Sequence, residues 1–192
     1  EQAHQLALLA HQAGTAPIVA ADADPAGEQA SERAYWLLTQ HALHPQSITL
    51  SPGSDPADTL TRHGPESLRR TLEEATPLAH HVTAQRLHRH TGLDALHRSV
   101  AAVAADRPEH WDNGTRQVAD TTHIPLPVVR RELAKALQER ADNPRAVTEK
   151  QITAATARPV PPPAPAAERP PRGAPAPAPS STVSAPDRGP SR

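Results

Sequence analysis

Residues 17–27 read Pro-Ile-Val-Ala-Ala-Asp-Ala-Asp-Pro-Ala-Gly, and the predicted fold is built outward from this segment. The apolar run from Pro17 to Ala21 predicts a short buried strand. Residues i and i+2 of an extended chain point to the same side, so Asp22 and Asp24 are expected to stand side by side. The Pro-Ala-Gly sequence then turns the chain into a pattern typical of a helix over residues 28–42.

The two aspartates allow two interpretations. Carboxylates are hard oxygen ligands for a divalent cation, and the repulsion between them is relieved when a cation lies between them. Alternatively, Asp24 caps the N-terminus of the following helix while Asp22 is only solvated. Both interpretations stay open on these residues alone.

A second motif lies further along the chain, where residues 52–58 read Pro-Gly-Ser-Asp-Pro-Ala-Asp. A short strand over Ser47 to Leu50 is expected before it. Together with the Asp-Ala-Asp-Pro-Ala-Gly segment at 22–27, this motif resembles the Toprim domain of bacterial DNA primases, in which Asp-x-Asp is followed by Pro-x-Gly-x-Asp-Pro-x-Asp. The resemblance spans residues 15–90 and extends more loosely to 140. It departs from many primases at Ala57, where an aspartate is often found.

The resemblance implies an α/β fold, here a partial Toprim domain with a parallel sheet flanked by helices. It also implies nucleotidyl transfer that makes a short RNA primer in DNA replication. Asp22 and Asp24 would be the catalytic pair holding Mg²⁺ or Mn²⁺, with Asp55 as a further metal ligand. Asp55 before Pro56 fits a helix N-cap equally well, and the two roles are compatible.

Nucleic-acid contact is expected from arginines on the helices that follow Asp55, where a primase-like template groove would run. These arginines are Arg69, Arg70 and Arg86. Their guanidinium groups would meet template phosphates. The implied partners are single-stranded DNA and nucleotides, with a replicative helicase as a further candidate.

Parts of the primase pattern are missing. No Glu-Gly strand end precedes Asp22, and the absence of cysteine removes a thiolate zinc module. The chain alone is therefore expected to be catalytically incomplete. The alternative is a non-catalytic DNA-binding or docking module of a larger replication or mobile-element protein. A Toprim nuclease or topoisomerase is disfavoured, because the single tyrosine, Tyr35, lies in the middle of a predicted helix.

Composition sets further bounds. The 192 residues include 23 prolines, two tryptophans, one tyrosine and no phenylalanine, which is a poor supply of core side chains. A formal net charge of −1 excludes a surface that is basic throughout, so nucleic-acid contact would need local patches. The lack of methionine predicts a fragment of a longer protein. Without a long apolar run or signal peptide, we expect a soluble, cytoplasmic protein with no membrane partner.

Three regions are predicted. Residues 1–76 form the Toprim-like α/β segment, residues 77–157 a helical extension, and residues 158–192 a disordered tail rich in Pro, Ala and Ser. Histidines gather in the extension, at His80, His81, His88, His90 and His97. No pair of them at metal-ligand spacing joins a third convergent ligand, so a solvated histidine-rich face is predicted.

Overall fold

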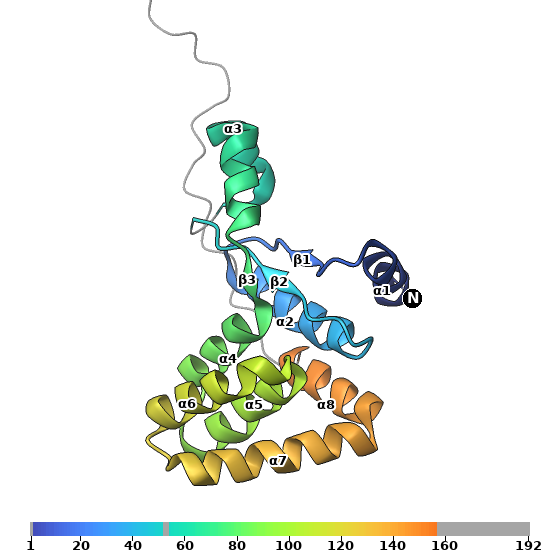
Figure 1. The fold of residues 1–192 in the computed structure, drawn as a ribbon. Coiled ribbons are helices and arrows are strands. Elements are labelled where there is room, and N and C mark those ends of the chain that lie inside the picture. The colour runs from blue at the N-terminus through green and yellow to red at the C-terminus, as the bar shows by residue number, and fades with distance from the viewer. Residues whose placement is uncertain (1, 52–53, 157–192) are drawn as a thin grey trace, which may run out of the picture. The chain divides into compact units, whose positions relative to one another are not determined.

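The computed structural model describes residues 2–51 and 54–156, and this part of the chain is mostly helical (Figure 1). The elements in chain order are α1 (Gln2–Ala13), β1 (Ile18–Val19), α2 (Pro25–Thr39), β2 (Gln46–Ser47), α3 (Pro56–Glu73), β3 (Thr76–Pro77), α4 (Leu78–Arg89), α5 (Gly92–Ala105), the 3₁₀ helix η1 (Pro108–His110), α6 (Trp111–Thr122), α7 (Leu126–Asp142) and α8 (Pro144–Thr156). The predicted disordered tail at 158–192 lies outside the described residues.

The sheet is much smaller than the predicted one. Its order is β1-β2-β3, and each strand has two residues. β1 and β2 pair in parallel, with Ile18 opposite Gln46, as predicted for the first two strands. β3 adds an antiparallel edge that the sequence did not predict. The expected parallel α/β sheet is therefore corrected to one parallel pair within a mostly helical fold.

Proline explains part of this shortening. Pro17 and Pro45 immediately precede β1 and β2, and Pro77 lies within β3. A proline has no N–H to donate, so the ladder cannot continue through these positions as it would through other residues. Ile18 is also 39% exposed rather than buried. Little apolar burial is therefore available to extend the strands.

Helix α2 begins earlier than predicted, at Pro25 rather than residue 28. The fixed φ of proline suits the first helical position, and Asp24 caps the helix. Gly27 lies in the first turn, against the backbone of Asp22. A Cβ added there would come within 2.0 Å of the Asp22 carbonyl oxygen. Only glycine allows the helix to start so close to the Asp-x-Asp segment.

Two of the core clusters show how the predicted segments are related, and the first of them joins the two segments. In one, Tyr35 and Trp36 of α2 pack against Leu78 and Val82 of α4 and Ala102 of α5. Both aromatic residues are therefore core residues. The other cluster lies among α4, α5, α6 and α7, and its members are Leu87, Ala95, Leu96, Val100, Val103, Ala104, Val118, Ala119, Val129 and Leu133. Helical burial of this kind supports the predicted helical extension.

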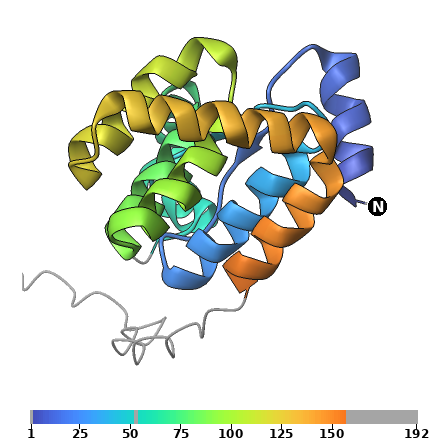
Figure 2. The same cartoon turned by 90° about the horizontal axis from the view of Figure 1, so that it is seen from below.

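The residue 76 boundary does not separate two cores. α2 from the first predicted segment packs on both α4 and α8 from the second. In Figure 2, α8 (orange) runs beside α2 (blue). The described residues accordingly belong to one compact unit.

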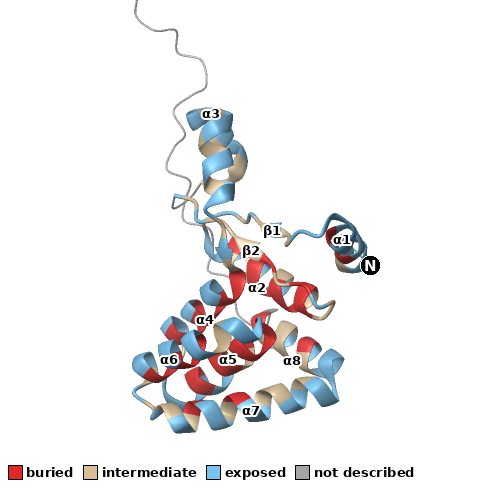
Figure 3. Cartoon of the chain, in the orientation of Figure 1, coloured by how far each residue is buried: buried red, intermediate tan, exposed pale blue. Residues whose placement is uncertain are grey.

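Helix α3 differs from the other long helices because none of its residues is buried (Figure 3). It is kinked at Gly64, whose φ of 79° lies in the left-handed region, and Pro65 starts the second half. The two halves of α3 are thus separated by a glycine turn. Within residues 2–51 and 54–156, no helix combines the length and apolar character needed to cross a bilayer.

Candidate functional site

The two predicted motif segments meet at the carboxyl ends of β1 and β2. We call Asp22, Asp24 and Asp55 the acidic edge. The backbone N–H of Ala23 donates a hydrogen bond to the carbonyl oxygen of Ser54, with an N–O distance of 3.2 Å. Because β1 and β2 are parallel, the loops that leave them emerge at the same end of the pair. The Asp-x-Asp segment and the loop before Asp55 are thus linked directly.

Two of the three aspartates cap helices. Asp24 Oδ1 accepts a hydrogen bond from the N–H of Gly27 at 2.7 Å, and Asp55 Oδ1 accepts one from the N–H of Asp58 at 2.6 Å. Both capping residues have extended backbones and precede a proline at the first helical position. The N-cap interpretation of Asp24 and Asp55 is confirmed. Each bond uses one carboxylate oxygen and leaves Oδ2 outside the cap.

Asp22 has a different setting. It is exposed, as Asp24 is, but it caps no helix and lines a cavity of about 390 Å³. Glu28 of α2 and His81 of α4 also line this cavity, and Glu28 forms an ion pair with Arg89. Burial lowers the pKa of His81, which favours its neutral form. The cavity therefore holds oxygen and imidazole groups that can bind a cation.

The three aspartates do not converge as a ready-made ligand set. In the described part of the chain, the group that brings three metal-binding atoms within 4.8 Å of one another is His80, Asp106 and His110. This His–Asp–His cluster joins α4 to the connection between α5 and α6. No pair from the predicted histidine set takes part in this cluster. His80 alone of that set meets two ligands from outside it, Asp106 and His110, and the sequence analysis did not anticipate this.

One part of this cluster could have been found in the sequence, namely the pair of Asp106 and His110 at spacing i, i+4. The histidine-rich segment at 80–97 does not include it. Asp106 and His110 are four residues apart, and His110 Nδ1 lies 2.9 Å from Asp106 Oδ2. The rings of His80 and His110 have centroids 5.4 Å apart. An Asp followed by a His at i+4 is a common local pair, but only the packing of α4 on α5 brings His80 to it.

The predicted nucleic-acid contacts divide into two groups. Arg69 and Arg70 are exposed on α3, where phosphate can reach them. Arg86 is 1% exposed, and its guanidinium binds Glu32 Oε1 with Nε at 2.9 Å and Nη2 at 2.5 Å. It also lies over the Trp36 ring, 4.9 Å from the centroid. Arg86 was expected to contact template phosphates. This expectation is corrected, because its guanidinium is buried and paired with Glu32.

Tyr35 is equally unsuited to attack a phosphate. Its hydroxyl is buried and donates to the carbonyl oxygen of Ala102 at 2.7 Å. Burial, followed by the nearby charge of Asp106, raises the pKa of Tyr35 far above its ordinary value. The residue therefore stays protonated and serves packing, in line with the sequence argument against a topoisomerase.

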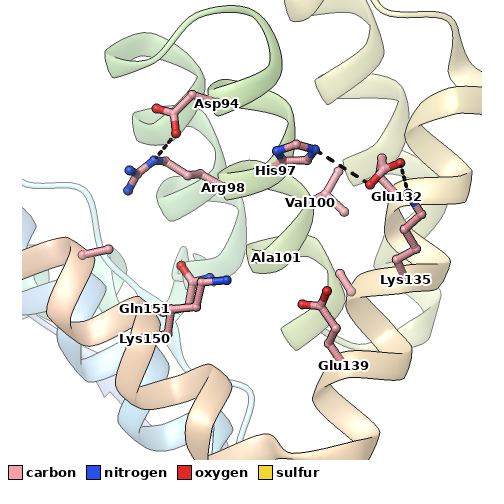
Figure 4. Close-up of a pocket in the computed structure, with 12 residues that line it drawn as sticks. Asp94, His97, Arg98, Val100, Ala101, Glu132, Lys135, Glu139, Lys150 and Gln151 are labelled. Atoms are coloured by element: carbon pink, nitrogen blue, oxygen red, sulfur yellow. Dashed lines mark hydrogen bonds and ion pairs between the residues drawn. The ribbon is translucent and has the colours of Figure 1, made fainter.

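A second cavity, of about 460 Å³, lies among residues of α5, α7 and α8 (Figure 4). Its charged side chains are largely paired with one another. Arg98 Nε lies 2.7 Å from Asp94 Oδ1, and Lys135 Nζ lies 2.7 Å from Glu132 Oε1. The hydrogen bond from Lys135 lowers the pKa of Glu132. Such mutual pairing is typical of a solvated charged surface and assigns no chemistry to this cavity.

No family model, curated protein or solved structure matches this chain. The features that bear on function are therefore the two sequence motifs and the geometry of the acidic edge.

Proposed function

We propose that this chain is a Toprim-type segment of a DNA primase-like protein, acting in metal-dependent nucleotidyl transfer during RNA primer synthesis. The observation that carries the proposal is the hydrogen bond from Ala23 to Ser54. It links the Asp-x-Asp segment to the loop before Asp55 at the carboxyl ends of two parallel strands. Sites of open α/β folds form at such strand ends.

The donor chemistry of the acidic edge fits Mg²⁺ or Mn²⁺. Both ions prefer oxygen ligands, and Asp22 together with the uncapped Oδ2 atoms of Asp24 and Asp55 supplies them. A bound ion would neutralise phosphate charge during transfer. The protein's own part is to place Asp24 and Asp55 through their caps, because each cap fixes the carboxylate against a helix N-terminus.

Template binding is assigned to Arg69 and Arg70 on α3. Both side chains are exposed, and the ion pair of Arg69 with Glu66 is long at 3.8 Å between exposed groups. A surface pair of this kind is weak and gives way readily to a phosphate. Single-stranded DNA and nucleotides are the partners that follow, and a replicative helicase remains a further candidate.

A Mn²⁺ titration tests the metal assignment. Electron paramagnetic resonance of the chain should show Mn²⁺ binding that weakens by about tenfold or more in Asp22→Ala, because one ligand charge is lost. Asp24→Asn should weaken binding similarly while keeping the helix cap, since asparagine caps as well as aspartate. Asp120→Asn, an exposed substitution on α6, is the matched control. Equal binding in all four proteins would refute the site.

Activity is tested by ribonucleotide incorporation on single-stranded DNA with the full-length gene product. Wild type should make primers in Mg²⁺ or Mn²⁺, and Asp24→Asn should reduce synthesis sharply. Template binding should survive that change but fall in the double variant Arg69→Ala/Arg70→Ala, with a shallower salt dependence.

One observation favours a second candidate, the non-catalytic DNA-binding or docking module. Asp24 and Asp55 are already satisfied as caps, and the three aspartates do not converge as a ligand group within the described residues. In this case the aspartates of the acidic edge would serve to cap α2 and α3, and would bind metal weakly or not at all. DNA binding without primer synthesis in either metal would select this candidate.

A further inference from the structure

A different set of elements carries the one convergent ligand group among the described residues. His80 lies in the first turn of α4, Asp106 directly follows α5, and His110 is the last residue of η1. One potential ligand atom from each lies within 4.8 Å of those of the other two. We propose that His80, Asp106 and His110 bind a divalent transition-metal ion of the zinc class.

The ligand types and spacing suit this ion. Two imidazoles and one carboxylate form a common ligand set for zinc sites that keep a position open. With metal–ligand distances of about 2.0–2.2 Å, tetrahedral ligand atoms lie roughly 3.4 Å apart. The present ligand atoms lie within 4.8 Å of one another, so each pair has at most about 1.4 Å to close, and side-chain rotation within a rotamer well supplies a movement of this size.

Local hydrogen bonds hold two of the ligands in place. The N–H of Asp106 donates to the carbonyl oxygen of Val103 at 3.1 Å, and the carbonyl oxygen of Asp106 accepts from Trp111 Nε1 at 3.0 Å. The N–H of His110 donates to the carbonyl oxygen of Arg107 at 3.0 Å. The turn is thus fixed before any ion arrives, which is what a metal site needs for affinity.

Charge also favours a cation at Asp106. Its carboxylate is buried, and among the described residues its ion pair is with His110, a group that is charged only when protonated. A buried carboxylate without a permanent cation is costly, and a metal ion would offset that cost. Asp106 also lies at the C-terminus of α5, where the helix dipole attracts positive charge. The neighbouring Arg107 opposes this, although it pairs with Glu109 at 3.9 Å.

A small cavity provides the open coordination position. It has a volume of about 150 Å³, and its lining includes Asp106, His110 and His44. His44 Nδ1 is buried there without a hydrogen-bond partner. The cavity is large enough for water, and a metal-bound water within it would have a polar atom to meet. The cluster therefore resembles a three-ligand site more than a closed structural one.

Zinc calorimetry and cobalt absorption spectroscopy of the full chain test the proposal. Wild type should bind one equivalent of Zn²⁺, and Co²⁺ should show the absorption of a low-symmetry site. His80→Ala should weaken binding by about tenfold or more and abolish the cobalt signal. His88→Ala, an exposed change on the same helix, should bind like wild type. Zinc should also raise Tm in wild type and His88→Ala, because an ion bound to the folded state stabilises it.

His80→Ala is the decisive variant because His80 is exposed and its removal leaves the core intact. Asp106→Asn is a second test: it should also weaken zinc binding, and a circular dichroism spectrum that matches wild type would show that the variant is folded. Equal zinc affinity in wild type and His80→Ala, or no stoichiometric binding in either, would overturn the proposal and leave only an Asp106–His110 ion pair. Asp22→Ala should retain zinc binding, so failure of the acidic-edge site and failure of this one are distinguishable.

Discussion

In the helical core around α2, α4 and α5, polar side chains are buried, whereas at the acidic edge they are exposed to solvent. In the core, Arg86 and Tyr35 are each 1% exposed and are fully occupied by partners inside the protein. At the edge, Asp22 is exposed, and α3, which follows Asp55, buries no residue. Similar polar side chains therefore serve stability in one region and remain available to ligands in the other. We expect substitutions in the two regions to separate stability from binding.

The largest expected effect breaks the buried ion pair. Arg86→Ala leaves the carboxylate of Glu32 buried without its cation, so the free energy of unfolding should fall by about 3–5 kcal/mol. Urea denaturation followed by circular dichroism measures this. The double variant Arg86→Met/Glu32→Leu should recover most of the loss, because it removes both charges and keeps apolar volume.

The matched arginine at the other region is Arg70 on α3. Arg70→Ala should change stability by less than about 0.5 kcal/mol, because its side chain is exposed. It should instead weaken binding to single-stranded DNA. A loss of stability in Arg70→Ala comparable to that in Arg86→Ala would show that the two regions do not differ as described.

The next effect compares two glycines, Gly27 where α2 starts beside the acidic edge and Gly114 where α6 packs on α5. A Cβ at Gly27 meets the Asp22 backbone at 2.0 Å, whereas a Cβ at Gly114 meets the Val103 side chain at 2.8 Å. Backbone cannot move aside, so Gly27→Ala should cost about 1–3 kcal/mol. A valine can rotate, and alanine also favours the helix by roughly 1 kcal/mol, so Gly114→Ala should cost less. Equal losses in urea denaturation would contradict the close approach of α2 to the acidic edge.

Sequence periodicity predicted the helical core better than the sheet. Leu78, Val82 and Leu87 of the predicted helical extension are apolar at helical spacing, and all three are buried. A helix repeats such a pattern over several turns. The strand expected from Pro17 to Ala21 is reduced to Ile18–Val19. A short apolar run does not reveal how many of its residues find a partner strand, and the flanking prolines limit the ladder.

The candidate sites were predictable only where their residues are neighbours in sequence. The N-caps at Asp24 and Asp55 follow from a local pattern, an acidic residue before proline. The burial of Arg86 does not, because its partner Glu32 lies on α2, far away along the chain. The meeting of His80 with Asp106 likewise depends on the packing of α4 against α5. Long-range packing therefore decides which charged residues are available for binding.

A smaller effect comes from the helix caps themselves. Asp24→Ala should lower the free energy of unfolding by about 1 kcal/mol, because α2 is packed into the core and its fraying is felt globally. Asp55→Ala removes an equivalent cap, but α3 buries no residue, so helix content should fall with little change in the global unfolding midpoint. Asp24→Asn and Asp55→Asn are the controls, and both should retain helix content. Equal global losses at Asp24 and Asp55 would mean that α3 unfolds together with the core.

The smallest effect concerns a surface ion pair on α5, the counterpart of the buried pair at Arg86. The hydrogen bond from Arg98 holds the pKa of Asp94 below its usual range, and the two charges lie 2.7 Å apart. Because the folded-state pKa is depressed, the ionised form stabilises the fold above the unfolded pKa of about 3.9, and this contribution is lost as pH falls through the folded value. Half of the Asp94 side chain is exposed to solvent, so the pair contributes less than about 1 kcal/mol.

Asp94→Asn should therefore lower the free energy of unfolding slightly at pH 7, and the difference from wild type should vanish in acid below the folded pKa. Urea denaturation at both pH values measures this, with Asp120→Asn as the exposed control. A difference that stays the same at both pH values would mean that the carboxylate charge of Asp94 is not what stabilises the start of α5.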